Sequence, residues 1–341
     1  MIPQALLRQL SDVENAKGRQ EVFRRQHPQA LEALVEIARV QSVEASNAIE
    51  NITAPPQRIK ELVAEKTTPQ NRSEAEIAGY RAVLDLIHSS ADTIPFRPSV
   101  VEQLHRDLYQ FTGNRNAGAW KKFDNTVEEE LPDGTRRVRF SPVPASATPE
   151  AMDELHRRFN EAIDQDAYHR LLLTGAYVLD FLVIHPFSDG NGRMSRLLSL
   201  LLLYQGDYEV GRFISLEKLI NDSKETYYEA LGASTVGWHD GAHDLRPWLS
   251  YFLGIVKRGY DLFVQRVGAL ATGKGAKANA VRTFVRSRIS DTFKFDEVRM
   301  AVPGASDVYL RETLRKMRDE GILRQEGRGT NAIWRRLRTD F

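Results

Sequence analysis

Twelve consecutive residues near the middle of the chain, from His185 to Arg196, constrain the fold more than any other segment. They read His-Pro-Phe-Ser-Asp-Gly-Asn-Gly-Arg-Met-Ser-Arg and lie between two strongly apolar segments. The preceding segment, from Tyr168 to Ile184, is apolar nearly all round, which is typical of a helix in a protein core. The following segment, from Gly192 to Tyr204, is also a predicted helix. The sequence therefore predicts a polar, glycine-containing loop held between two core helices.

The residue types in this loop are suited to binding an anion. Gly190 and Gly192 flank Asn191, and residues of these types tolerate positive φ, so backbone N–H groups can converge there. The loop opens directly onto a helix N-terminus, where free amides and the helix dipole favour phosphate. Arg193 and Arg196 lie three residues apart on one helical face and can bind further phosphate oxygens. We therefore expect a phosphate cradle here.

Two other residues of the loop add chemistry to this cradle. Asp189 has no basic neighbour within the loop and is a candidate ligand for Mg²⁺, which usually takes one or two carboxylates together with substrate phosphates. His185 can take a proton from an attacking hydroxyl, because the ordinary pKa of histidine is near ~6.5. Each feature alone is more often a cap, a turn or a solvated face. Their occurrence within twelve residues favours a functional site.

These residues match the signature of the Fic family, His-Pro-Phe-x-Asp/Glu-Gly-Asn-Gly-Arg-x-x-Arg, at every fixed position, so the chain resembles Fic proteins. The resemblance implies a mainly helical Fic core with a β-hairpin flap. It also implies a Mg²⁺-dependent protein adenylyltransferase, which transfers AMP from ATP to a hydroxyl of a target protein and releases pyrophosphate. The implied roles are His185 as base, Asp189 as Mg²⁺ ligand, Gly190, Asn191 and Gly192 as anion hole, Arg193 near the β-phosphate and Arg196 on the γ-phosphate.

A predicted hairpin precedes the loop. Trp120 to Glu130 and Arg136 to Phe140 read as strands around the turn Leu131-Pro132-Asp133-Gly134-Thr135. By resemblance this is the flap that binds an extended target segment by adding to its edge. The predicted target-binding residues are Val138, Arg139, Phe140 and Ser141. The alternative is a surface hairpin without a ligand.

An aromatic pair follows the loop. Tyr227 and Tyr228 resemble a tyrosine pair that lines the nucleotide pocket in the family, although such pairs are more often core. An asparagine that some members carry near the base is Thr235 here, which weakens the case for purine recognition. His239 and His243 suggest metal ligands at first sight, but the intervening glycine and polar setting predict a structural loop.

An inhibitory segment is predicted near the N-terminus. Ser46 and Glu50 fit the motif Ser/Thr-x-x-x-Glu-Gly/Asn of Fic proteins that carry their own inhibitor, on a predicted helix that must end before Pro55-Pro56. If this helix packs beside the cradle, Glu50 would pair with Arg196 and occupy the guanidinium that the γ-phosphate needs. The alternative is an exposed helical glutamate.

The C-terminal residues predict a separate module. Ala271 to Ala278 is small and polar and suits a linker. The residues beyond it read as a winged helix-turn-helix, with Ser306 or Asp307 as a helix cap and a hairpin around Gly327-Arg328-Gly329. From residue 306 to 341 nine Lys and Arg stand against six Asp and Glu, a local net charge of +3. DNA is therefore one candidate partner of residues 306–341, and a protein is the other.

The whole chain of 341 residues has a formal net charge of +1 and no cysteine. This excludes global steering onto nucleic acid or membranes, a disulfide framework and a cysteine nucleophile. We expect a cytoplasmic protein without a membrane span, with three regions: an N-terminal helical region (1–95), a Fic core (96–262) and a winged helix (280–341). Its predicted partner is a protein with a Ser, Thr or Tyr hydroxyl, including itself, and a homodimer is left open. Two other functions remain: a Fic enzyme that transfers or removes another phosphate-linked group, and a DNA-binding regulator with a nucleotide-responsive core.

Overall fold

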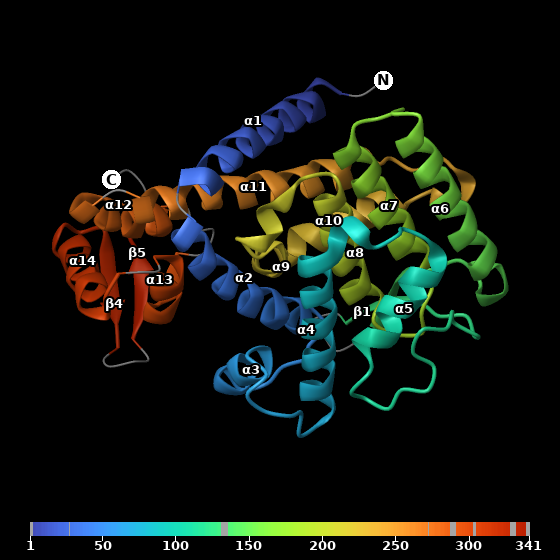
Figure 1. Cartoon of the computed structure of the whole chain (residues 1–341), viewed down its shortest axis with the longest axis horizontal. Coiled ribbons are helices and arrows are strands. Elements are labelled where there is room, and N and C mark those ends of the chain that lie inside the picture. Colours follow the sequence, from blue (N-terminus) through green and yellow to red (C-terminus); the bar gives the residue numbers. More distant parts are fainter. Residues whose placement is uncertain are drawn as a thin grey trace. The chain divides into compact units, whose positions relative to one another are not determined.

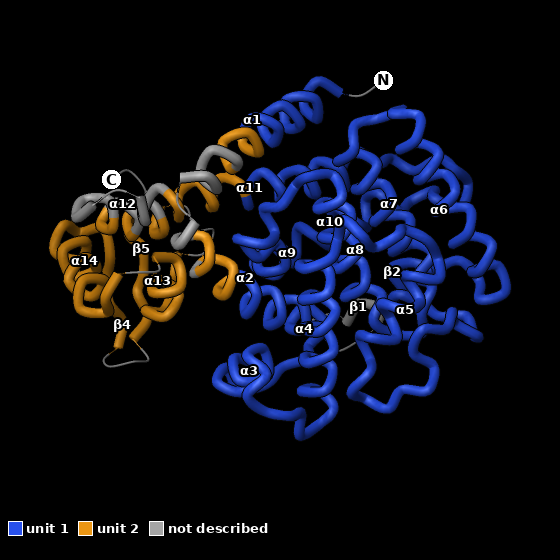
Figure 2. The backbone as a smooth tube through the Cα atoms, in the orientation of Figure 1, with its two compact units in different colours: residues 1–15, 38–259 blue, residues 16–37, 260–341 orange. Residues whose placement is uncertain are grey.

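The computed structural model of the protein describes residues 3–26, 28–130, 136–271, 273–286, 291–302, 305–327 and 332–338. The described chain is mainly helical, with a two-stranded and a three-stranded antiparallel sheet (Figure 1). It divides into two compact units, residues 1–15 with 38–259 and residues 16–37 with 260–341 (Figure 2). The expected mainly α fold is thereby confirmed. Among the helices described, none has both the length and the apolar character to cross a membrane.

The larger unit, residues 1–15 and 38–259, contains most of the helices. Helices α1 (Gln4–Gln26), α2 (Pro28–Ile49) and α11 (Arg246–Ala271) contribute to both units. The others of this unit are α3 (Pro56–Val63), α4 (Arg72–Ser90), α5 (Pro98–Leu108), α6 (Thr148–Asp164), α7 (Arg170–Ile184), α8 (Asn191–Gln205), α9 (Leu216–Asp222) and α10 (Lys224–Thr235). Short 3₁₀ turns connect several of them.

Local sequence signals explain where these helices begin. The Asn71 side chain caps α4 by accepting from the Glu74 amide at 2.9 Å. Prolines stand in the first turns of α5 and α6, where their missing N–H is harmless. The two predicted helices that flank the loop agree with the structure to within two residues at each end.

Helices α7 and α8 form the centre of the larger unit. They pack against each other, and α6 packs on α7 while α4 packs on α8. Both central helices are apolar on most faces, and their buried side chains include Leu171, Leu179, Phe181, Val183, Met194, Leu197, Leu198, Leu201 and Leu202. The loop between these two helices is therefore held at both ends by the core.

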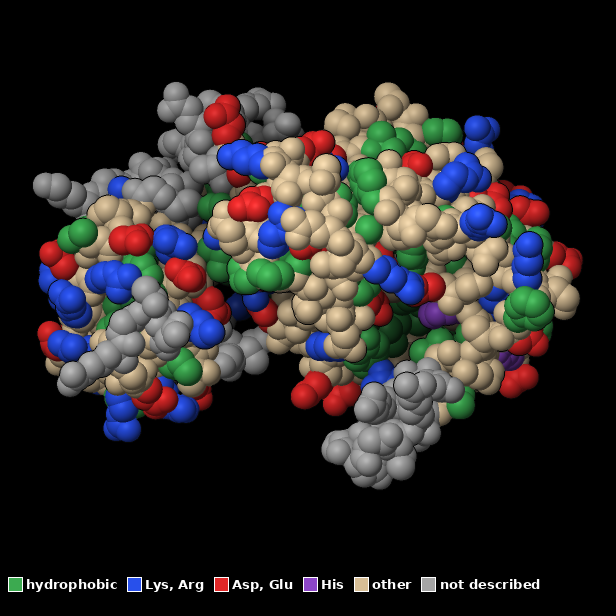
Figure 3. All heavy atoms as spheres, turned by 90° about the horizontal axis from the view of Figure 1, so that it is seen from below, with side chains coloured by type: hydrophobic (Ala, Val, Ile, Leu, Met, Phe, Trp, Pro, Cys, Tyr) green, Lys and Arg blue, Asp and Glu red, His purple; other side chains and the backbone are tan. Residues whose placement is uncertain are grey.

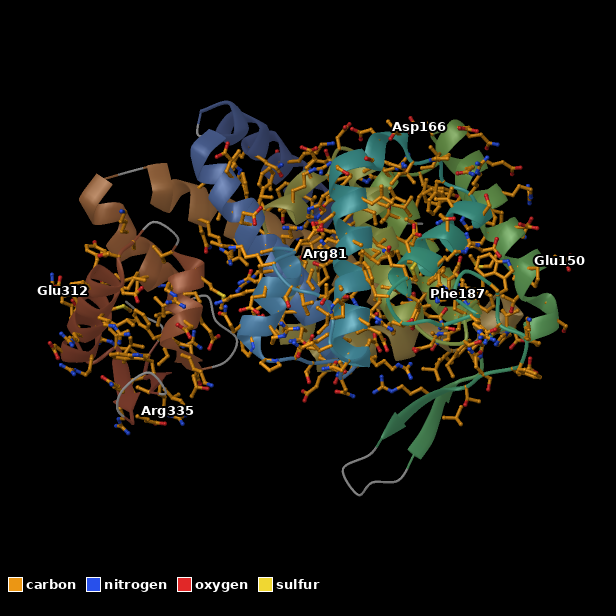
Figure 4. The ribbon with its side chains drawn as sticks, turned by 60° about the horizontal axis from the view of Figure 1, so that its bottom comes forward. Arg81, Glu150, Asp166, Phe187, Glu312 and Arg335 are labelled. Carbon is orange, nitrogen blue, oxygen red and sulfur yellow. The ribbon has the colours of Figure 1, made fainter. Side chains whose placement is uncertain are left out.

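The hairpin consists of β1 (Val127–Glu130) and β2 (Arg136–Phe140), which pair antiparallel with Val127 opposite Phe140. Figure 4 shows both strands extending away from the helices, whereas the labelled Phe187 lies among the helices. The predicted first strand was too long, because residues 120–126 form no strand. Lys121 instead bonds the loop beside the central helices, its amide donating to the Pro186 carbonyl at 2.8 Å. The predicted turn from Leu131 to Thr135 lies outside the described residues.

The smaller unit contains α12 (Gly273–Arg286), α13 (Phe295–Ala301) and α14 (Asp307–Asp319). Its strands β3 (Thr292–Lys294), β4 (Leu323–Glu326) and β5 (Ile333–Arg336) form a sheet in the order β3-β5-β4. The Ser306 side chain caps α14, as one reading of the sequence expected. Its core includes Val285, Phe293, Val298, Leu310, Leu314, Met317 and Trp334. This arrangement is consistent with a winged helix-turn-helix, although Arg328 and Gly329 of the predicted turn are not among the described residues.

The predicted linker from Ala271 to Ala278 was wrong. Helix α11 continues to Ala271 and α12 begins at Gly273, while Thr272 lies outside the described residues. Alanine and lysine are among the strongest helix formers, and they dominate residues 276–280. Their propensity outweighs the two glycines on which the linker prediction depended.

Candidate active site

The loop between α7 and α8 begins with a strained backbone at His185. This residue ends α7 in the left-handed region, with φ 51°, and its amide donates to the Phe181 carbonyl at 2.9 Å. Gly190, with φ 79°, precedes the first residue of α8. A Cβ at Gly190 would lie 2.8 Å from the Tyr109 hydroxyl, so only glycine fits there. The loop is therefore tight at both ends.

Asn191 and Phe187 close the loop from within. The Asn191 side chain accepts from the Phe187 amide at 2.9 Å and donates to the Phe187 carbonyl at 2.8 Å. The Phe187 ring is fully buried and stacks on His105 with the ring centroids 3.7 Å apart. Both polar atoms of the Asn191 side chain are thus used to shape the loop. Asn191 itself could contact an anion only through its backbone amide.

Neighbouring segments brace the same loop. The Lys121 ammonium donates to the Ile184 carbonyl at 3.0 Å and to Asn125 at 2.9 Å, and burial lowers the pKa of Lys121 to about 8. His105 accepts from the Gly118 amide through Nδ1 at 2.9 Å. Its Nε2 therefore carries the proton and donates to the Asp189 carbonyl at 3.1 Å. Both braces come from the segment of residues 105–125.

The hydrogen bond of His185 fixes the tautomer of its ring. Its Nδ1 lies 3.2 Å from the Leu182 carbonyl, which can only accept, so Nδ1 carries the proton and the lone pair is on Nε2. Burial is the main cause that lowers the pKa of His185 to about 4. The imidazole is therefore neutral at pH 7 and can accept a proton.

Asp189 offers an exposed carboxylate beside the start of α8. The side chain is 57% exposed, and one of its oxygens accepts from the Gly190 amide at 2.7 Å. The other oxygen lies 3.8 Å from the Arg72 guanidinium, a basic neighbour from α4 that the loop sequence does not reveal. One exposed carboxylate beside a helix N-terminus fits Mg²⁺, which usually takes one or two carboxylates together with substrate phosphates. The described residues contain no cluster of three or more His, Asp or Glu that could hold a metal alone.

Arg193 is buried, with its side chain only 1% exposed. Its Nη2 lies 2.8 Å from the Glu76 carboxylate of α4 and donates to the Tyr109 hydroxyl at 2.7 Å. Its Nε and Nη1 are buried without a hydrogen-bond partner in the described part of the chain.

Arg196 is joined to the end of α2. Its Nε donates to the Ser46 hydroxyl at 2.8 Å, and its Nη2 lies 2.9 Å from Glu50 Oε1. Glu50 also closely approaches Gly192, where a Cβ would lie 2.2 Å from the same Oε1. The Glu50 carboxylate therefore lies at the N-terminal turn of α8, against the backbone of the cradle.

A buried hydrogen-bond network anchors this end of α2. Ser42 and Ser46 are fully buried and lie four residues apart on one face of the helix. The Glu217 carboxylate accepts from Ser42 at 2.7 Å and from the Tyr80 hydroxyl at 3.0 Å. The end of α2 that precedes Glu50 is thus held by two contacts, one from Ser42 to Glu217 and one from Ser46 to Arg196.

The tyrosine pair and the flap lie at the other side of the site. Tyr227 is buried and Tyr228 is half-buried, and the Arg139 guanidinium lies 4.4 Å from the centroid of the Tyr228 ring. A groove of about 330 Å³ is lined by Val138, Arg139, Phe140 and Ser141 of the hairpin and by Thr235, Gly237, Trp238, His239 and Asp240. Figure 3 shows a hollow on one face of the larger unit, with hydrophobic side chains inside and charged and histidine side chains at its rim.

His239 has a structural contact with the flap. Its ring stacks on Phe140 with centroids 5.3 Å apart, and its Nε2 lies 2.8 Å from the Ser141 carbonyl. Thr235 bonds its own helix, its hydroxyl donating to the Gly232 carbonyl at 3.0 Å. The sequence interpretation of residues 239–243 as a loop agrees with the short 3₁₀ turn found there.

Sequence reasoning missed several residues of the site, notably Glu76, Arg72, His105, Lys121 and Glu217. Each reaches the loop or the end of α2 from an element far away in sequence. Only two features of the sequence could have indicated these residues. They are the charged residues among the apolar positions of α4 and the lysine that follows Trp120.

Comparisons with known proteins agree with this architecture. Residues 95–203 match the Fic/DOC family. The chain is 23% identical over 236 residues to the "Protein adenylyltransferase Fic" of Nematostella vectensis, covering 66% of this chain and 48% of that protein. A protein of the same name from Aedes aegypti is 33% identical over 88 residues, which are 26% of this chain and 15% of that protein. The chain thus aligns with about half, or less, of these relatives.

Solved structures show the same fold. A Fic family protein from Desulfovibrio desulfuricans superimposes with a TM-score of 0.64 at 19% identity, over 98% of this chain and 97% of that one. A Fic domain containing signaling protein from Bacteroides thetaiotaomicron gives a TM-score of 0.63 at 21% identity, over 75% of this chain and 97% of that one.

The fold and the site thus define a helical protein with a tight glycine-containing loop at the start of a core helix. Residues 95–203 are similar to the Fic/DOC family, and the chain has the fold of the solved Fic family structures. The matched residues include the loop from His185 to Arg196, whereas Glu50 and the tyrosine pair lie outside them.

Proposed function

We propose that this protein is an adenylyltransferase that transfers AMP from ATP to a hydroxyl side chain of a protein, and that Glu50 restrains the transfer. One observation carries the proposal. The neutral His185 begins the loop that contains Gly190 and Gly192, and two buried arginines follow this loop in the first turns of α8. The names of the relatives from Nematostella and Aedes support the same reaction.

The loop supplies the groups that this reaction requires. The hydroxyl oxygen of the target attacks the α-phosphate, the bond to pyrophosphate breaks, and the hydroxyl proton passes to His185 Nε2. The backbone amides at Gly190 to Gly192 stabilise the charge that develops on the phosphate oxygens. Arg193 and Arg196 bind the pyrophosphate portion, which holds the α-phosphate in line with the hydroxyl.

The test of this reaction is the position of the transferred phosphorus. The purified chain is incubated with candidate target protein and with ATP labelled at either the α- or the γ-phosphate. AMP transfer predicts label in protein from the α-position alone. Label from the γ-position would instead favour the alternative, a Fic enzyme that transfers another phosphate-linked group.

Asp189 is the residue that would hold Mg²⁺ in this protein. The bound ion would neutralise phosphate charge and orient the leaving pyrophosphate. We expect Asp189→Ala to lower AMP transfer at millimolar Mg²⁺ and to recover part of it at higher Mg²⁺, because a weakened site can be refilled by mass action. Transfer rates measured over a Mg²⁺ titration check this, and a defect that is independent of Mg²⁺ would argue against a role in metal binding.

The proposed restraint follows from the place of the Glu50 carboxylate. It pairs with Arg196 and lies against Gly192, so it competes for the positive groups that the γ-phosphate needs. ATP would then bind in a pose that misplaces the α-phosphate, and misplacement of about 1 Å can cost on the order of 10²-fold in rate.

The flap is the proposed contact for the target. The edge of β2 and the groove beside it suit an extended segment, whose backbone can pair with residues 138–141. A hydroxyl of the chain itself is included among the targets. The tyrosine pair, together with Arg139, is the proposed wall of the nucleotide pocket.

DNA binding by the smaller unit is the second candidate function, and the winged helix-like arrangement of residues 273–338 is what favours it. The helix α14 exposes Arg311 and Arg315, with Arg311 lying 4.0 Å from the centroid of the Phe295 ring. If α14 binds duplex DNA, Arg311→Ala with Arg315→Ala should reduce the slope of log affinity against log salt by roughly two. Gel shifts over a salt series measure this slope, and no binding of any duplex at low salt excludes this function.

A further inference from the structure

Glu76 is a buried carboxylate that the proposed reaction does not use. Its Oε2 lies 2.8 Å from Arg193 Nη2, and the two side chains are 5% and 1% exposed. The Tyr109 hydroxyl accepts from the same nitrogen at 2.7 Å. A planar guanidinium that is held on one nitrogen by two partners has little freedom to turn. Arg193 is thus fixed in one orientation by α4 and by the residue that follows α5.

The other nitrogens of Arg193 indicate a ligand. Nε and Nη1 are buried, and no hydrogen-bond partner for them exists among the described residues. Buried N–H groups without acceptors are costly, and the oxygens of an anion can satisfy them. Arg193 also stands in the first turn of α8, where the helix dipole favours an anion.

Glu76 also binds a second arginine at the solvent edge. Arg72 Nε donates to Glu76 Oε1 at 2.8 Å, while Arg72 Nη2 lies 3.8 Å from Asp189. One carboxylate therefore lies between a buried and an exposed guanidinium. Its charge offsets part of the positive field at the cradle.

The geometry points to Glu76 as a positioning residue that holds Arg193 for the pyrophosphate portion of the nucleotide and moderates the affinity of the cradle for phosphate. The kinetic part of this inference rests on the proposed function. The binding part does not, because inorganic pyrophosphate can be bound without any transfer.

Glu76→Gln keeps an oxygen that can accept from Arg193 but removes the charge. Binding of inorganic pyrophosphate with Mg²⁺, measured by calorimetry, should tighten by at least about fivefold, because one uncompensated charge near the site is worth more than this at the dielectric of a protein surface. AMP transfer in the Glu50→Gly background should fall by about tenfold or more, because a neutral amide holds Arg193 more weakly than a carboxylate does and the arginine then misplaces the phosphates. A purely structural residue would weaken both binding and transfer.

Glu74→Gln is the matched control. Glu74 lies on the same helix with its side chain 4% exposed, and pairs with Arg58 at 2.6 Å, away from the cradle. We expect both variants to lower the thermal unfolding temperature, while Glu74→Gln leaves pyrophosphate affinity and AMP transfer unchanged. Glu76→Asp, which keeps the charge but shortens the reach, should bind pyrophosphate about as wild type does and still transfer AMP slowly.

A double-mutant cycle makes the inference specific. If Glu76 positions Arg193, the loss of AMP transfer caused by Glu76→Gln should disappear in the Arg193→Ala background. Weaker or unchanged pyrophosphate binding by Glu76→Gln, or the same loss of transfer without Arg193, would overturn the assignment. If Glu76→Gln tightens pyrophosphate binding but Glu50→Gly transfers no AMP, the moderating role of Glu76 stands and the proposed function fails.

Discussion

Glu50→Gly is expected to raise AMP transfer by on the order of 10²-fold, because the carboxylate no longer competes with ATP for Arg196. In the structure Glu50 Oε1 lies 2.9 Å from Arg196 Nη2 and against Gly192, which is the place the γ-phosphate would need. Initial rates at saturating ATP and Mg²⁺ measure the gain. Glu44→Gly is the control; Glu44 is an exposed glutamate on α2, which ends one residue before Glu50, and its replacement should leave the rate unchanged.

A variant of Arg196, the residue that pairs with Glu50, tests the same contact from the other side. Arg196→Ala should remove the gain, since the arginine released by Glu50→Gly is the group that binds the γ-phosphate. The double variant is the informative one, because two residues that act through one contact have non-additive effects. Equal rates for wild type and Glu50→Gly would show that this glutamate does not restrain the enzyme.

His185→Ala is expected to lower AMP transfer by about 10² to 10⁴-fold, the usual effect of losing a general base. Binding of ATP should change little, because other groups hold the phosphates and the base acts in the transition state. Parallel measurements of transfer rate and ATP affinity in the Glu50→Gly background separate these two effects.

The control for this variant is His169→Ala, at the other end of the same helix. The His169 side chain caps α7 by accepting from the Leu171 amide, so its removal tests whether a general loss of helix stability explains the defect. We expect near wild-type transfer from His169→Ala. Wild-type transfer by His185→Ala would contradict the mechanism.

Much of the helical fold follows from local patterns in the sequence. The two apolar segments that form α7 and α8 and the polar loop between them lie within forty residues, so this part of the fold could be predicted from residue types alone. The hairpin was predicted in part, since β2 was found over its predicted residues and β1 only over the last four. The segment before β1 packs against the loop instead, a choice that depends on tertiary contacts.

The parts that escaped prediction depend on long-range contacts. Glu76 and Arg72 stand more than one hundred residues before Arg193 and Asp189, and their charges give no local sign of those partners. The helix at residues 273–286 escaped prediction for another reason. Two glycines at its start are typical of a linker, but the helix propensity of the alanines that follow outweighs them. Local residue types therefore predicted the loop and its two helices, whereas the residues that support the loop required the structure.

The most direct test of the central claim is the intact mass of the purified chain after incubation with ATP and Mg²⁺. The Glu50→Gly variant is compared with Glu50→Gly carrying His185→Ala, in the presence of a candidate target protein. We predict that the target or the chain itself gains the mass of one or more AMP groups with the first protein and none with the second. An unchanged mass for both proteins, with ATP shown to bind, would contradict the claim that this site transfers AMP.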